Sequence, residues 1–211
     1  MKKRNLLLAA LLLIFVAPSF AAKVDTLLVN SPSMNKDVQV VVVTPDAALG
    51  KKAVACPVIY LLHGYGGNAK TWIGVKPDLP QIADEKGIIF VCPDGKNSWY
   101  WDSPKDPSYR YETFVSSELV KYIDGHYKTI ADRKGRAITG LSMGGHGAMW
   151  NAIRHKDTFG AGGSTSGGVD IRPFPLNWDM SKQLGEFAYN KKVWDEHTVI
   201  NQIDKIENGD L

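Results

Sequence analysis

The stretch that decides the fold is "RAITGLSMGGHGAMW", residues 136–150. Its centre, Gly140-Leu141-Ser142-Met143-Gly144, matches the pattern G-x-S-x-G, in which a serine occupies a sharp turn between a strand and a helix. The β-branched run before the turn and the helical pattern after it predict that strand and that helix. The turn would lift the hydroxyl of Ser142 above a sheet edge, and the flanking glycines leave room for the strained backbone. We therefore expect Ser142 to be a nucleophile.

A second glycine-rich stretch, "LLHGYGGN" at 61–68, follows another apolar run. Acyl transfer through a serine needs two backbone N–H groups placed around the negatively charged oxygen of the tetrahedral intermediate. The residue after the serine supplies one of them, and a loop after an earlier strand supplies the other. These two positions correspond to Met143 and Tyr65, which we expect to form the oxyanion hole.

Apolar runs and helical patterns alternate along the rest of the chain. Apolar runs predict strands at 38–45, 57–64, 88–95 and 136–139, and a small-residue run predicts a fifth at 159–168. Apolar spacing and helix-stop signals predict helices at 78–87, 109–126, 144–155 and 196–207. Because strands and helices alternate without internal repeats or linkers, we expect one domain of the α/β class. Its sheet would be mostly parallel, with helices on both faces.

Residues 1–22 have the organisation of a secretory signal peptide. A basic start precedes an apolar run from Leu6 to Val16, and small residues at Ala21 and Ala22 offer a cleavage site. The run is shorter than the roughly 20 residues that span a bilayer, so a stable membrane anchor is not expected. This leader predicts a secreted or periplasmic protein whose mature part begins near residue 23.

Net charge gives no sign of a polyanionic partner. Residues 1–21 contain three basic and no acidic side chains, so 22 basic residues stand beside 22 acidic ones in the rest of the chain. The formal charge of +3 therefore belongs to the leader, and we expect neither nucleic acid nor an anionic membrane as a partner.

Five strings carry a resemblance to a known family: "LLHGYGG", "VCPDG", "SWYWDSP", "YETFVSSELVKYID" and "ITGLSMGGHGAM". They resemble the esterase group of the α/β-hydrolases, which includes S-formylglutathione hydrolases of the esterase D type, tributyrin and feruloyl esterases, and mycolyltransferases. The resemblance extends over residues 25–211. It implies an α/β-hydrolase domain over residues 23–211 that hydrolyses carboxylic esters through an acyl-serine intermediate without a cofactor. The substrate would be a small-molecule or polysaccharide-linked ester.

The acid and histidine that should activate the serine are not found. The α/β-hydrolase fold orders its catalytic residues as serine, acid and histidine, and the resembling family carries the last two beyond the region that ends here at Leu211. We therefore expect the domain to be incomplete at its C-terminus, with the last strands of the sheet missing. The run at 159–168 would then be an exposed edge, which favours marginal stability and self-association. Two alternatives follow: a catalytically silent remnant or binding module, and an acyltransferase.

None of the five histidines is predicted to act as the general base. His146 follows Ser142 by four residues on the expected helix, where a structural role is expected, and His63 is expected to brace the oxyanion loop. The other three are expected at helix ends or in solvent: His126, His155 and, in a charged stretch, His197. The acidic residue of the "PDG" turn signal, Asp94, is expected to form a turn.

Two further features carry expectations. The loop "NSWYWDSP" would place Trp99 and Trp101 on the catalytic edge, where they could wall an acyl or aryl pocket or pack onto the core. Cys56 precedes one predicted strand and Cys92 ends the next, so parallel strands would hold the two residues at opposite ends. Since a disulfide needs Cα atoms within about 7 Å, we expect two buried thiols.

Overall fold

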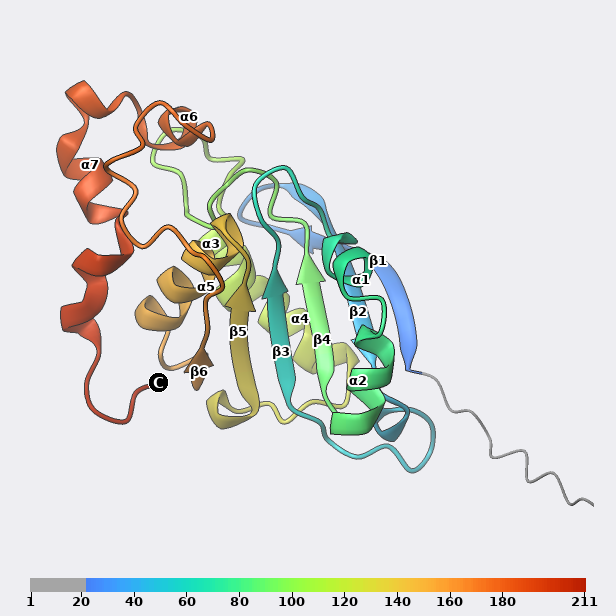
Figure 1. Ribbon diagram of the computed structural model, residues 1–211. Coiled ribbons are helices and arrows are strands. Elements are labelled where there is room, and N and C mark those ends of the chain that lie inside the picture. Colours follow the sequence, from blue (N-terminus) through green and yellow to red (C-terminus); the bar gives the residue numbers. More distant parts are fainter. Residues whose placement is uncertain (1–21) are drawn as a thin grey trace, which may run out of the picture.

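The computed structural model describes residues 22–211, and the expected signal peptide lies outside these residues except for Ala22. Six strands of the described part form one twisted sheet in the order β1-β2-β4-β3-β5-β6 (Figure 1). Their bounds are β1 Lys23–Ser31, β2 Lys36–Thr44, β3 Val58–Leu62, β4 Ile89–Pro93, β5 Arg136–Gly140 and β6 Ala161–Gly162. Neighbours among β4, β3, β5 and β6 are parallel, whereas β1 and β2 form an antiparallel pair and β2 is antiparallel to β4. The predicted α/β class with a mostly parallel sheet is confirmed.

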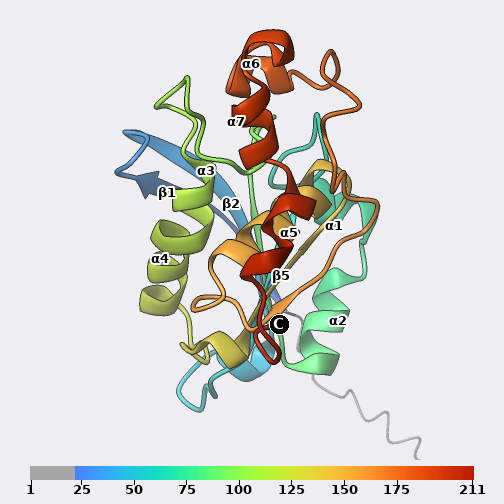
Figure 2. The ribbon, with the colours of Figure 1, turned by 90° about the vertical axis from the view of Figure 1, so that its left-hand side faces the viewer.

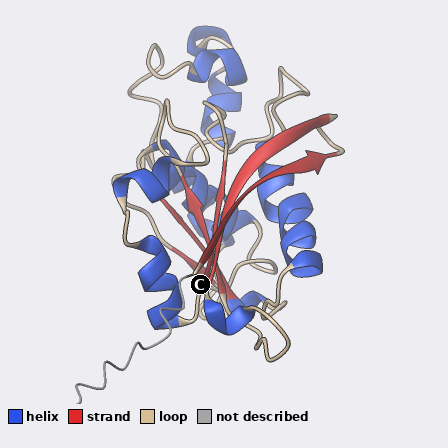
Figure 3. Cartoon of the chain, turned by 90° about the vertical axis from the view of Figure 1, so that its right-hand side faces the viewer, coloured by secondary structure: helices blue, strands red, loops and turns tan. Residues whose placement is uncertain are grey.

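Side-chain alternation along the strands supplies a core on each face of the sheet. On β2, Val40 and Val42 face one core, and Val41 and Val43 face the other. The larger core lies under α4 (Leu119–His126) and α5 (Met143–Arg154), and the smaller lies under α2 (Leu79–Lys86). Figure 3 shows the helices on the two sides of the sheet.

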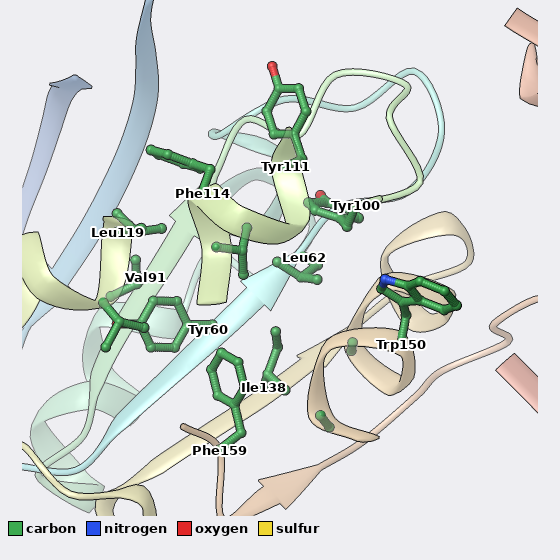
Figure 4. Packing of buried hydrophobic residues seen from close by; sticks show 14 of the residues in the cluster. Tyr60, Leu62, Val91, Tyr100, Tyr111, Phe114, Leu119, Ile138, Trp150 and Phe159 are labelled. Carbon is green, nitrogen blue, oxygen red and sulfur yellow. The ribbon is translucent and has the colours of Figure 1, made fainter. Parts of the chain in front are cut away.

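Aromatic residues dominate the larger core. Tyr60 on β3 meets the ring of Phe159 edge-on, with centroids 5.7 Å apart, and both side chains are fully buried. Figure 4 shows this pair beside Ile138 of β5 and Leu62 of β3. Such edge-to-face pairs add stability beyond the apolar area that they bury. The core therefore fixes β3 and β5, the two strands that lead into the glycine-rich turns.

Several short helical segments complete the described chain. Those before the G-x-S-x-G turn are η1 (Asp46–Ala48), α1 (Thr71–Val75), α3 (Tyr111–Thr113), the π-helical segment η2 (Phe114–Glu118) and η3 (Arg133–Gly135). Those after it are α6 (Met180–Leu184), η4 (Phe187–Tyr189), α7 (Lys191–Glu196) and η5 (Val199–Lys205). Figure 2 shows α7 and the chain after it descending along α5.

The predicted elements differ from the structure in three places. Strand β1 was not predicted, because it is an edge strand in which even the apolar Val24 and Leu28 are exposed, so no buried apolar run indicates it. The expected strand at 159–168 is reduced to the two residues of β6, since its glycines disfavour extended pairing. The helix expected at 196–207 is instead the 3-10 helix η5, separated from α7. The helix expected at 109–126 is confirmed as the consecutive segments α3, η2 and α4.

Both cysteines are free and buried, as predicted. Cys56 lies just before β3, and Cys92 lies near the end of the parallel strand β4. Over residues 22–211, no helix is long and apolar enough to cross a membrane.

Candidate active site

Ser142 occupies the sharp turn between β5 and the first residue of α5. Its backbone lies at φ 54° and ψ −116°, outside the regions that a non-glycine residue ordinarily adopts. Its N–H donates to the carbonyl of Thr165 at 2.8 Å, and its carbonyl accepts the N–H of His146 at 3.0 Å. The residue is exposed, whereas the helix that follows it is almost entirely buried. The turn therefore presents the hydroxyl at the N-terminus of α5, where the helix dipole favours negative charge.

Glycines allow this turn to pack against the sheet. A Cβ on Gly140 would lie 2.3 Å from the carbonyl oxygen of Gly144. A Cβ on Gly144 would lie 2.2 Å from the carbonyl oxygen of Leu62 on β3. Real Cβ atoms do not approach backbone oxygens so closely, so any side chain at either position would push α5 away from the sheet.

The loop expected to carry an oxyanion donor, residues 63–68 and here called the oxyanion loop, lies directly beside the serine. A Cβ on Gly64 would be 3.5 Å from the Cβ of Ser142, which places the next residue, Tyr65, at the same turn. Among the described residues, the backbone N–H groups of Tyr65 and Met143 donate no hydrogen bond. Tyr65, Ser142 and Met143 line one cavity. Two unused N–H donors thus border the cavity that the hydroxyl faces.

His63 braces the oxyanion loop from below. Its Nδ1 donates to the carbonyl of Gly64 at 2.8 Å, and its Nε2 accepts the N–H of Gly95 at 2.9 Å. Both ring nitrogens of this buried side chain are therefore used, and neither is free to take a proton from Ser142. The loop's backbone is also held by Tyr100, whose hydroxyl accepts the N–H of His63 at 3.0 Å.

Asp94 has the turn role that its sequence context indicated. Its Oδ1 accepts the backbone N–H of Lys96 at 3.0 Å, and its Oδ2 pairs with the Lys96 ammonium group at 2.7 Å. These contacts close the turn after β4.

The cavity beside Ser142 measures about 240 Å³ and is mostly apolar. Of the two tryptophans that the sequence offered for the pocket, Trp99 lines this cavity and Trp101 does not. Trp101 is fully buried and meets the His146 ring edge-on at 5.1 Å, so of the two roles left open for this loop it has the second, packing onto the core. The remaining wall comes from the segment after β6: Ser166, Gly168, Asp170, Ile171, Phe174, Trp178 and Met180.

No proton acceptor is placed against the serine within residues 22–211. The hydroxyl oxygen of Ser142 makes no hydrogen bond to any group in this part of the chain. His146 is buried, its Nδ1 donates to the carbonyl of Gly168 at 2.7 Å, and burial lowers its pKa to about 4. It is thus a neutral packing residue, as its place on the helix predicted.

The other three histidines also lie in structural positions. His126 ends α4, as predicted, and His155 follows α5 with its Nε2 2.8 Å from the Oε1 of Glu112. His197 was expected in solvent, but it is half-buried and its ring stacks on Trp150 at 5.5 Å. That expectation was wrong because the charged stretch around His197 folds back onto α5. No cluster of three or more metal-ligating side chains occurs among residues 22–211.

Sequence reasoning missed the wall of the cavity. Residues 169–180, here called the strap, pass beside Ser142 and contribute Phe174, Trp178 and Met180 to the lining. The only available signal was compositional: "IRPFPLNWDM" contains two prolines and two aromatic residues without helical or strand periodicity. Such a segment forms a loop, and its apolar side chains then pack against another part of the molecule.

Comparison with known proteins agrees with this geometry. A parallel sheet with a serine at a strained strand-to-helix turn defines the α/β-hydrolase fold. The family described as "Putative esterase" matches residues 31–208. This chain therefore belongs to that esterase family.

Individual relatives place the chain among esterases and related antigens. It is 28% identical over 169 residues to an esterase of Mycobacterium tuberculosis, covering 72% of this chain and 36% of that protein. It is 35% identical over 150 residues to the MPT51/MPB51 antigen of Mycobacterium bovis, covering 70% and 46%. A solved ferulic acid esterase superposes with a TM-score of 0.72 at 29% identity, covering 90% of this chain and 74% of that one. The chain thus spans less than half the length of these two curated relatives.

Proposed function

We propose that this chain carries the nucleophile and the oxyanion hole of a carboxylic ester hydrolase. Ser142 is the nucleophile, and the backbone N–H groups of Met143 and Tyr65 are the oxyanion donors. The observation that carries the proposal is the strained turn that exposes Ser142 in a cavity bordered by these two unused donors. Strain of this kind persists at functional sites because the surrounding structure holds it.

The proposed reaction has two steps. The Ser142 oxygen attacks the ester carbonyl carbon, and the carbonyl oxygen becomes an oxyanion between the two N–H donors. The intermediate collapses by breaking the bond to the alcohol, which leaves with a proton, and an acyl-serine remains. Water then attacks the acyl-serine, releases the carboxylic acid and restores the hydroxyl.

The proton that leaves Ser142 needs an acceptor, and we assign that role to no residue between 22 and 211. Removal of the base and its partner from a serine hydrolase lowers the rate by several orders of magnitude, leaving the contribution of the oxyanion hole and of binding. We therefore expect the chain, assayed as it stands, to acylate slowly, with solvent taking the proton.

Hydrolysis of p-nitrophenyl acetate tests the nucleophile. The wild-type chain is compared with Ser142→Ala and with Ser117→Ala, a control serine on η2. We expect Ser142→Ala to lose the protein-dependent rate and Ser117→Ala to keep it. Equal rates in wild type and Ser142→Ala would overturn the assignment.

A non-catalytic binding module is the second candidate, favoured by the unpartnered hydroxyl of Ser142. A fluorophosphonate probe separates the two candidates, because oxyanion donors beside a nucleophilic serine speed its labelling above that of a free serine even where no base is in place. Labelling that depends on Ser142 and exceeds the rate of a free serine supports the hydrolase. A folded chain that binds an ester and is never labelled supports the binding module.

The substrate proposed is a small-molecule or polysaccharide-linked ester whose acyl group enters the apolar cavity. The aromatic lining of Trp99, Phe174 and Trp178 suits a flat or apolar acyl group. One relative is named an acetyl esterase, and one solved structure is named a ferulic acid esterase. These names state the acyl groups of the esters for those two proteins.

Export is part of the proposal and rests on the leader in residues 1–22. The mature protein should begin near Ala22 or Lys23 and should be found outside the cytoplasm. Intact-mass measurement of the protein from its natural compartment tests this, and an uncleaved N-terminus in the cytoplasm would contradict it.

A further inference from the structure

The strap and the oxyanion loop are joined by a hydrogen bond that the proposed reaction does not use. The hydroxyl of Tyr65 donates to Oδ2 of Asp179 at 2.7 Å, although the two residues are 114 positions apart. The same carboxylate pairs with the ammonium group of Lys182 at 2.9 Å on α6. On its other side the loop is held by Asn97, whose Oδ1 accepts the N–H of Gly66 at 2.9 Å. The residue that carries a proposed oxyanion donor thus lies between two anchors.

The backbone around Asp179 is strained. Trp178 and Asp179 are consecutive non-glycine residues with φ values of 51° and 56°. The segment that faces them has the same feature, since Trp99 and Tyr100 have φ values of 58° and 61°. The indole N–H of Trp99 donates to the carbonyl of Trp178 at 3.2 Å and links the two segments. A left-handed conformation is unfavourable for such residues, so the surrounding contacts must hold it in place.

Charge suits Asp179 to this contact. Hydrogen bonds from Tyr65 and Lys182 lower the pKa of Asp179, and the bond to Asp179 raises the pKa of Tyr65. Around neutral pH the pair therefore consists of a protonated phenol and a carboxylate, the combination that gives a strong hydrogen bond. Tyr65 is 39% exposed, so this bond and not burial fixes its side chain.

We propose that Asp179 is a positioning residue for the oxyanion hole. By holding the Tyr65 hydroxyl, it fixes the loop that carries a proposed oxyanion donor beside the cavity, and it couples that donor to the strap that walls the cavity. This inference rests on the proposed role of the Tyr65 N–H. It assigns Asp179 no contact with the substrate.

A double-mutant cycle on Tyr65→Phe and Asp179→Ala tests the coupling through the Ser142-dependent hydrolysis of p-nitrophenyl acetate. Each single variant should lower kcat by up to about tenfold with little change in KM, since a charge-assisted bond is worth about that factor and solvent exposure reduces it. The double variant should be no slower than either single variant. Asp179→Asn keeps an acceptor oxygen and should recover part of the rate.

Asp78→Ala serves as the matched control. This exposed carboxylate pairs with Lys76 at 2.7 Å but does not contact the oxyanion loop, so its removal should leave kcat unchanged. Additive losses in the cycle, a change confined to KM, or unchanged kcat in Asp179→Ala would each overturn the proposal.

A second measurement is independent of activity. Backbone ¹⁵N relaxation is measured in Ser142→Ala with and without Asp179→Ala. The amides of Tyr65 and Gly66 should have order parameters near those of rigid backbone while Asp179 is present, and should fall below about 0.6 without it. Asp78→Ala should cause no change. If wild type shows no Ser142-dependent reaction, the proposed function fails, and the order parameters alone then decide whether Asp179 holds the loop. Order parameters that do not change in Asp179→Ala would overturn the positioning role of Asp179.

Discussion

The G-x-S-x-G turn and the strap border the same cavity but are held there by different means. The turn is fixed by close backbone packing of Gly140 and Gly144 and by a helix that is buried along most of its length. The strap is anchored in the core by Ile171 and Met180, but between them it is held by individual hydrogen bonds and leaves Leu176 96% exposed and Phe174 45% exposed. Ser142 is therefore positioned by the core, whereas we expect the exposed middle of the strap, which walls the cavity, to tolerate substitution without loss of the fold.

Substitution of two phenylalanines measures how differently the core and the strap contribute to stability. Phe159→Ala removes a fully buried ring that packs against Tyr60 and should lower the free energy of unfolding by about 4 kcal/mol. Phe174→Ala removes a half-exposed ring from the strap and should cost less than about 1 kcal/mol. Chemical denaturation of both variants measures the difference. Similar losses would show that the strap is as much a part of the core as the sheet is.

Two glycines test the turn itself. Gly144→Ala places a Cβ against the carbonyl of Leu62 and should destabilise the protein by about 3 kcal/mol. Gly125→Ala in α4 meets no atom within 4 Å and should stabilise the helix by about 0.5–1 kcal/mol. Thermal melting of the two variants should move in opposite directions. A neutral Gly144→Ala variant would contradict the close packing of the turn on β3.

Glu112 tests how α5 is anchored to the helix beside it. This buried carboxylate accepts hydrogen bonds from Trp150, Arg154 and His155. Burial alone would raise its pKa, but the bonds from His155 and Arg154 outweigh burial and lower it to about 2 from 4.5. Glu112→Gln should cost about 2 kcal/mol at neutral pH.

The pH dependence of this effect has a definite sign. Because the folded pKa of Glu112 lies below its unfolded value, its contribution is full above about pH 4.5 and is lost as the pH falls toward 2. The difference in stability between wild type and Glu112→Gln should therefore shrink at pH 3. Glu85→Gln, an exposed control on α2, should match wild type at both pH values. A difference that stays constant with pH would exclude the Glu112 charge as its source.

The smallest effect on stability is expected at the edge of the sheet. Strand β6 pairs with β5 on one side, and both of its residues are exposed. We expect self-association through this edge, and Ala161→Lys should reduce it because a charged side chain opposes edge pairing. The free energy of unfolding should change by less than about 0.5 kcal/mol. Size-exclusion chromatography across a range of concentrations measures the association. A wild-type chain that stays monomeric throughout would contradict the expectation.

The sequence predicts the G-x-S-x-G turn but not the strap. The turn around Ser142 is encoded in contiguous residues, because its glycines, its strand and its helix follow one another. The braces of His63 and the turn at Asp94 were predicted for the same local reason. The buried strands were found because both of their faces are apolar.

The strap could not be predicted, because its position depends on contacts between distant residues. The link between Tyr65 and Asp179 is a single hydrogen bond between residues 114 positions apart, and no periodicity in the sequence indicates it. Trp101 shows the same limit: its neighbour Trp99 lines the cavity while Trp101 is buried against His146, and composition alone does not separate the two. His197 was misplaced because the fold, not its local charge, buries it against Trp150.

The nucleophile role of Ser142 is tested most directly by mass spectrometry, which locates the acyl group after prolonged treatment with p-nitrophenyl acetate. Trypsin releases residues 137–154 as one peptide, in which Ser142 is the only serine. We predict one added acetyl group on this peptide. Fragmentation should assign the group to Ser142, and the peptide from Ser142→Ala should carry no acetyl group. A folded chain that hydrolyses the ester while this peptide stays unmodified, or that carries the acetyl group on another residue, would contradict it.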